Sequence, residues 1–173
     1  MEILAFVLSS LGTVCICIPP ILKGKNMKLI LLLIFLTNVL IATSYILTGA
    51  LNGAASCCIG AAQTLINYFF ERKNKAIPNW LIGIYAIAFT IANVLVFTKI
   101  TDALALLAAL AFIMAICQKN GKTYRIWTFI NTGLWIIYDA ISLSFGPLCT
   151  HIIQFATIIC GMILHDRANK KPR

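Results

Sequence analysis

Seven apolar runs, separated by short polar or basic breaks, fill almost the whole 173-residue chain. A helix that crosses a bilayer needs about 20 predominantly apolar residues, and each run is close to that length. The runs are Ile3–Leu22, Met27–Gly49, Asn52–Phe70, Ile77–Thr98, Asp102–Gln118, Tyr124–Leu143 and Phe145–Leu164. With 61% hydrophobic and 11% charged residues, the chain is more apolar than soluble domains are. The sequence predicts an all-α integral membrane protein with seven transmembrane helices and no soluble catalytic domain.

The basic residues predict the orientation of these helices. Of the 14 lysines and arginines, all except Lys99 follow the first, third, fifth or seventh run. Because lysine and arginine concentrate in cytoplasmic loops, we expect a multi-pass cell (inner or plasma) membrane protein with an outer N-terminus and a cytoplasmic C-terminus. This clustering accounts for the net charge of +9 without a nucleic-acid partner. The expected partners are membrane lipid and a small-molecule solute, and a homo-oligomer stays open.

The sequence also argues against several kinds of chemistry. The cysteines lie within or at the ends of apolar runs and lack the Cys-x-x-Cys spacing of zinc or redox sites. We therefore expect no metal, disulfide or cofactor. The sequence contains no His-Glu-x-x-His, Gly-x-Ser-x-Gly or P-loop motif and no paired intramembrane carboxylates. It does not predict an enzyme, nor does it predict a cleaved signal peptide, because no basic segment precedes the first run.

Internal similarity suggests two related units. Sliding the chain along itself places Asn38 on Asn131, Tyr45 on Tyr138 and Gly53 on Gly146. Each unit would have a basic break after its first helix, an almost uncharged hairpin, and a basic break at its end. Two three-helix units can run parallel only if an additional helix carries the chain back across the membrane. We therefore expect one membrane domain, 1–173, with a 3+1+3 architecture: parallel repeats at 1–75 and 101–173, joined by a linker helix within 76–100.

Three segments carry a resemblance to a known superfamily. Cys17–Lys23 resembles the proline-bearing end of helix one in PQ-loop proteins, with Pro20 where that motif has glutamine. Leu47–Ser56 resembles the hairpin of the bacterial YgjV-type inner-membrane proteins, and Trp135–Tyr138 resembles the Trp-x-x-Tyr of semiSWEET transporters. The chain resembles the SWEET and semiSWEET transporters, and along nearly its whole length the YgjV-type family. This resemblance implies a SWEET-like fold and transport.

The resemblance also implies a central pocket. Trp135 matches the tryptophan that lines the sugar pocket of semiSWEETs, and His151 stands where that family has a pocket asparagine. The first-unit counterparts are Ala42 and Cys58. Since these two offer little beyond shape, we expect an asymmetric site formed mainly by the second unit.

Polar side chains within apolar runs usually face the interior of a helix bundle. Together with the resemblance they give the predicted substrate-binding residues Trp135, His151, Gln154, Asn38, Asn131, Tyr138 and Cys58. Other roles stay open: interhelical hydrogen bonds for the two asparagines, an interfacial position for the tryptophan, and a backbone carbonyl partner for the histidine. Convergence of these side chains on one cavity would favour a site over simple packing.

The predicted function is small-molecule transport by alternating access between the two repeats. The solute would be polar and uncharged or weakly charged, such as a sugar or metabolite. We expect Asp139 to be a solvated carboxylate at the outer mouth, which leaves no carboxylate deep in a span and favours facilitated movement. The alternative is a non-transporting membrane scaffold or partner subunit.

Overall fold

The described part of the chain folds into seven α-helices and one short 3₁₀ helix. The computed structural model describes residues 2–22, 26–48, 51–95, 97, 99–141, 143 and 145–166. The elements are α1 (Glu2–Cys17), η1 (Pro19–Ile21), α2 (Met27–Thr48), α3 (Leu51–Arg72), α4 (Asn79–Leu95), α5 (Asp102–Ile116), α6 (Gly121–Ile141) and α7 (Phe145–Asp166). No strand occurs among the described residues, so the predicted all-α class is confirmed.

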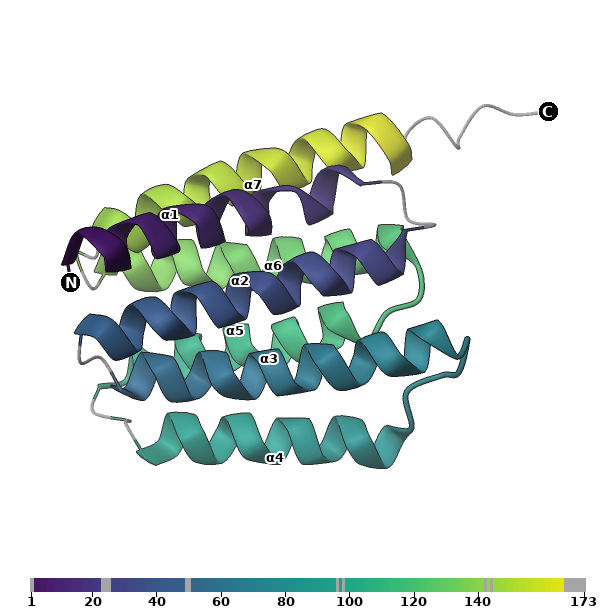
Figure 1. Ribbon diagram of the computed structural model, residues 1–173, viewed down its shortest axis with the longest axis horizontal. Coiled ribbons are helices and arrows are strands. Elements are labelled where there is room, and N and C mark those ends of the chain that lie inside the picture. The colour runs from purple at the N-terminus through teal and green to yellow at the C-terminus, as the bar shows by residue number, and fades with distance from the viewer. Residues whose placement is uncertain are drawn as a thin grey trace.

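The helices form a closed bundle in which consecutive helices alternate in direction. Figure 1 shows them side by side along the long axis, with α4 at one edge and α1 and α7 at the other. In chain order each helix packs against the next, and α7 returns to contact α1. The middle helices α2 and α6 each pack against both of their chain neighbours. The bundle therefore encloses an interior that every helix can reach.

The first predicted helix is shorter than expected. We predicted Ile3–Leu22, but α1 ends at Cys17 and the chain continues as η1. Pro19 and Pro20 cause this change, because proline has no N–H for the helical hydrogen bond and its ring collides with the preceding turn. Both prolines are buried. The end of the first run is therefore a short 3₁₀ helix with buried prolines, which the apolar pattern could not predict.

The bundle exposes many large aliphatic side chains and buries several polar ones, in addition to its buried apolar core. Large aliphatic side chains such as Ile87, Ile91 and Leu95 on α4 are exposed, whereas Asn67, Thr132 and Gln154 are buried. Soluble domains rarely expose large contiguous apolar surfaces, while a bilayer accepts them and disfavours polar groups. The outer surface is therefore suited to contact with lipid.

Three segments meet a strict length and hydropathy criterion for crossing a membrane, namely Ile3–Ile21, Met27–Leu47 and Pro147–Asp166. Helices α4 and α5 are apolar but shorter, and α3 and α6 are long enough but carry more polar residues. Three spans are thus supported among the described residues. The count of seven crossings stays a prediction.

One end of the bundle is basic. The end at which α1, α3, α5 and α7 finish, called the basic end below, holds Lys28, Arg72, Lys73, Lys75, Lys119, Lys122 and Arg125. Lys99 lies at the opposite end, where its backbone N–H donates to Asp102. The basic residues of 23–25 and 167–173, which the topology prediction also used, lie outside the described residues. The described basic residues therefore gather at one end, as the topology prediction assumed. The orientation of that end toward the cytoplasm stays a prediction.

Candidate functional site

An elongated cavity of about 440 Å³ runs through the interior of the bundle, and side chains from all seven α-helices line it. Toward the basic end its wall includes Ile34, Ile116 and Tyr124. These belong to a fully buried apolar cluster in which α2 meets α5 and α6. Toward the opposite end the wall contains aromatic and polar groups, among them Tyr45 and Tyr138. The cavity is therefore apolar at its basic end and polar at the other.

Most of the predicted site residues meet in this cavity. Those that line it are Asn38, Asn131, Trp135, Tyr138, His151 and Gln154. Cys58 does not line it and is exposed on the outside of α3, whereas the preceding Cys57 lines it. One residue along an α-helix turns the side chain by about 100°, so the alignment that selected Cys58 was one position out of register with the cavity.

Trp135, His151 and Asp139 form a compact group on α6 and α7. The indole and imidazole rings are stacked, with centroids 5.7 Å apart and planes at 11°. His151 Nδ1 donates to Asp139 Oδ2 at 2.6 Å, and the Tyr138 ring packs edge-on against Trp135 at 5.6 Å. Tyr138 in turn donates its hydroxyl to Asp102 at 3.4 Å. The carboxylate and the tryptophan together hold the imidazole in one orientation.

Asp139 is not the solvated outer carboxylate that we predicted from its place near the end of a run. It is 3% exposed, lines the cavity and is partnered by His151. The prediction was wrong because it used depth along the helix and ignored which face the residue occupies. Asp139 lies four residues after Trp135, which also lines the cavity, and that spacing places two side chains on the same helix face.

The two asparagines that the repeat pairs behave differently. Asn131 Nδ2 donates to Ala108 O of α5 at 2.7 Å, so this side chain links two helices and also lines the cavity. Asn38 Nδ2 donates within its own helix, to Ile34 O at 3.0 Å, and forms no interhelical bond among the described residues. Gly60 of α3 lies against it, because an added Cβ there would come within 3.0 Å of Asn38 Oδ1. The alternative role of joining helices through a hydrogen bond therefore applies to Asn131 and not to Asn38.

Gln154 is 6% exposed and lines the cavity. Its side-chain amide has no hydrogen-bond partner within the described part of the chain, although Gln154 O accepts from Thr157. A buried amide without a partner loses the free energy of hydration that water gave it, so this position favours a ligand or water in the cavity.

Sequence reasoning missed several residues that line the cavity, notably Tyr45, Asn93 and Cys57. Tyr45 could have been found, since the repeat pairs it with Tyr138. Asn93 on α4 is an amide within an apolar run, but it was not included in the predicted site.

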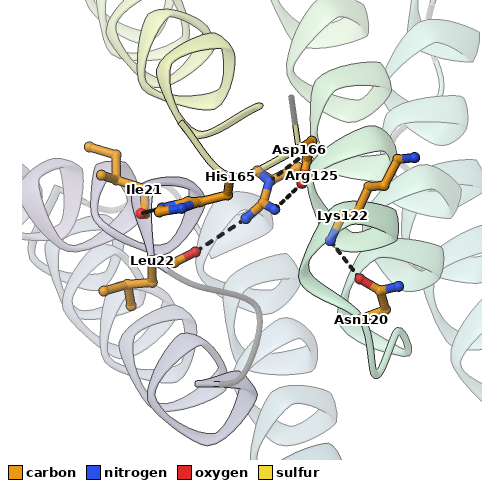
Figure 2. A network of polar contacts seen from close by, with 7 residues as sticks. All are labelled: Ile21, Leu22, Asn120, Lys122, Arg125, His165 and Asp166. Atoms are coloured by element: carbon orange, nitrogen blue, oxygen red, sulfur yellow. Dashed lines mark hydrogen bonds and ion pairs between the residues drawn. The ribbon is translucent and has the colours of Figure 1, made fainter. Parts of the chain in front are cut away.

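The basic end is closed by a polar network that Figure 2 shows. Arg125 of α6 is 2% exposed; its Nε donates to Asp166 Oδ2 at 3.0 Å, and a second nitrogen donates to the other carboxylate oxygen. Arg125 Nη1 also donates to Leu22 O at 3.2 Å, and His165 Nε2 donates to Ile21 O at 2.7 Å. Side chains of α6 and α7 therefore hold the segment that follows α1.

A close backbone contact lies beside this network. A Cβ atom added to Gly161 of α7 would come within 2.0 Å of Pro20 O and 2.8 Å of Pro20 C. Only glycine permits such an approach. The glycine, the two prolines and the network, together called the basic-end closure below, fix η1 against α7.

These features define a class, that of helical membrane proteins with a cavity inside the bundle that is partly lined by polar side chains. The comparisons identify the family within it. The sequence matches the Imp-YgjV family, described as bacterial inner membrane protein, over residues 4–169. The chain belongs to this family, and the predicted YgjV-type resemblance is confirmed. No curated protein and no solved structure matches the chain.

Proposed function

We propose that the protein moves a small polar solute across the inner membrane through the central cavity. The observation that carries this proposal is the convergence of six predicted polar or aromatic residues on one cavity. Its volume of about 440 Å³ lies within the range of roughly 300–1,000 Å³ found for small-molecule sites. Polar side chains inside a membrane bundle are costly, so polar groups that line a cavity favour a functional site.

The proposed mechanism is alternating access between two three-helix units, α1–α3 and α5–α7, joined by α4. Supporting this 3+1+3 arrangement, α2 packs against α1 and α3 while α6 packs against α5 and α7 in the same way, and α4 contacts both α3 and α5. The same arrangement supports a relationship to the SWEET superfamily. In the structure the basic-end closure and the apolar cluster around Tyr124 separate the cavity from the basic end. Opening that end requires η1 to part from α7.

Asp139 is a buried carboxylate, so facilitated movement can no longer be inferred from the absence of an acidic group within the spans. Asp139 is the only acidic side chain among the described residues that line the cavity. We assign it to the solute and not to a coupling ion, so movement down the solute gradient remains the proposed mode. Uptake that requires a proton or sodium gradient in proteoliposomes held at zero membrane potential would contradict this assignment.

The interhelical hydrogen bonds favour a second candidate, a scaffold without transport activity. Asn131 donates to Ala108 O, and Asn67 Nδ2 donates to Ile116 O at 3.0 Å, so some buried amides do join helices. Gln154 favours transport because its side chain lines the cavity and makes no bond to another helix among the described residues. Lack of a partner alone is not sufficient, since the buried amide of Gln63 is also unpartnered and does not line the cavity.

The test is uptake into proteoliposomes of a panel of labelled sugars, polyols, amino acids and amines. Wild-type protein is compared with Trp135→Ala, and with Trp80→Ala on the exposed start of α4 as the matched control. We expect wild-type and control protein to take up at least one solute and Trp135→Ala to lose that uptake. Equal uptake by all three would contradict the proposal, and the absence of uptake by wild-type protein would favour the scaffold.

A further inference from the structure

The electrostatic character of the cavity indicates the charge of its solute. No lysine or arginine is among the described residues that line it, and Asp139 supplies one carboxylate. His151 occupies Asp139 Oδ2, while Oδ1 has no partner within the described part of the chain. This oxygen opens onto the cavity, and in a low-dielectric site a carboxylate is stabilised by a cationic donor. An anionic solute would instead meet like charge in a low-dielectric site.

Three asparagine side chains of the cavity keep their carbonyl oxygens free to accept hydrogen bonds. Asn38 and Asn93 each donate an N–H to the carbonyl four residues earlier, at 3.0 and 2.8 Å, and Asn131 donates to Ala108 O. A carbonyl oxygen can only accept, so each contact must be made by the amide nitrogen. The three amide oxygens remain without partners among the described residues. Each amide nitrogen also keeps a second N–H, so the three amides offer donors as well as acceptors. Their oxygens, together with the carboxylate of Asp139, can accept from a solute that brings donors.

Aromatic rings form much of the remaining wall, from Tyr45, Phe89, Phe112, Trp135 and Tyr138. Aromatic faces attract organic cations, and this attraction strengthens when water is excluded. The same rings offer an apolar surface to a hydrocarbon body. A cationic head beside Asp139 and an apolar body along the rings would satisfy both features.

We propose that the solute is a primary organic amine in its ammonium form. This inference rests on the proposed function and specifies its substrate class. The ammonium group donates to Asp139 Oδ1 and to amide oxygens of the cavity, and its hydrocarbon part packs against Trp135 and Tyr138. Neutral solutes of the same shape bind more weakly, and carboxylates are excluded.

The test is equilibrium binding to the full-length protein in nanodiscs by isothermal titration calorimetry. Three probes share one ring and differ in charge: benzylammonium, benzyl alcohol and benzoate. We expect benzylammonium to bind about tenfold tighter than benzyl alcohol, the ratio of a single desolvated charge contact, and benzoate not to bind. Empty nanodiscs correct for partition into lipid.

Variants locate the effect. Asp139→Asn should lower the affinity for benzylammonium about tenfold and leave the affinity for benzyl alcohol nearly unchanged. Asp139→Glu, which keeps the charge, should retain the preference for the cation. Glu71→Gln removes a carboxylate outside the cavity and should leave all affinities unchanged, and thermal unfolding of each variant separates a lost contact from a lost fold.

Equal binding of the ammonium and the alcohol by wild-type protein would overturn the inference, whatever the variants do. So would a cation preference that persists in folded Asp139→Asn. If both probes bind equally and Trp135→Ala weakens both, the cavity remains a solute site and only the substrate class is wrong. If none of the probes binds, the amine class is wrong, and proteoliposome uptake of neutral solutes decides the proposed function independently.

Discussion

Replacing Gly161 by alanine should destabilise the protein strongly. The added methyl carbon would lie 2.0 Å from Pro20 O, so the η1 backbone must retreat by more than about 1 Å to reach an ordinary contact. A retreat of that size breaks the hydrogen bonds that His165 and Arg125 donate to the two carbonyls following Pro20. At about 1–2 kcal/mol for each bond, with residual strain added, we expect a loss of about 2–4 kcal/mol.

The assay is unfolding of the purified protein by titration with a denaturing detergent, followed by far-ultraviolet circular dichroism. The matched control is Gly83→Ala, since a Cβ at Gly83 of α4 would meet nothing within 4 Å. Alanine is the better helix former, so this control should be neutral or stabilising by up to about 1 kcal/mol. A loss below about 0.5 kcal/mol for Gly161→Ala would refute the close contact between η1 and α7, and an equal loss in both variants would refute its specificity.

Three further predictions concern the site, the basic end and the topology. Trp135→Ala should weaken solute binding about tenfold or more, whereas Cys58→Ser, on the outside of α3, should change it by less than about threefold; equal losses in binding titrations would refute the asymmetry. Arg125→Gln should lower the unfolding free energy by about 2 kcal/mol, because its partner carboxylate is 14% exposed and regains part of its hydration, and an unchanged detergent midpoint would contradict this. Reporter fusions after Arg173 and near Leu51 should show opposite sidedness, and the same sidedness for both would rule out seven crossings.

The helices were predictable because the bilayer imposes a simple requirement on sequence. Spans must be apolar and of similar length, so each of the seven predicted runs overlaps one helix of the structure. The end of the first run was predicted less well. The local conformational limits of proline explain why Pro19 and Pro20 interrupt α1. They do not determine which distant helix the following segment packs against, and in the structure this is α7 at Gly161.

The site was predictable to the extent that polar groups in a membrane interior are rare. Asn38, Asn131 and Gln154 were found as polar residues in apolar runs, and all three line the cavity. Asp139 was misjudged because a position near a helix end can face either water or the interior, and sequence position does not distinguish the two. Arg125 was interpreted only as a marker of topology, yet it is buried and paired with Asp166. The pairing could not be predicted because Asp166 lies 41 residues away in the chain.

The most direct test of the central claim compares two adjacent cysteines. Cys57 lines the cavity and Cys58 faces the outside of α3, so single-cysteine proteins that retain one or the other differ only in the side the thiol faces. The measurement is labelling in sealed membranes with a membrane-impermeant, positively charged methanethiosulfonate, applied from each side in turn. A cavity that opens alternately predicts that Cys57 reacts from both sides and that the lipid-facing Cys58 reacts from neither. Labelling of Cys57 from one side only, or from neither, would contradict the account.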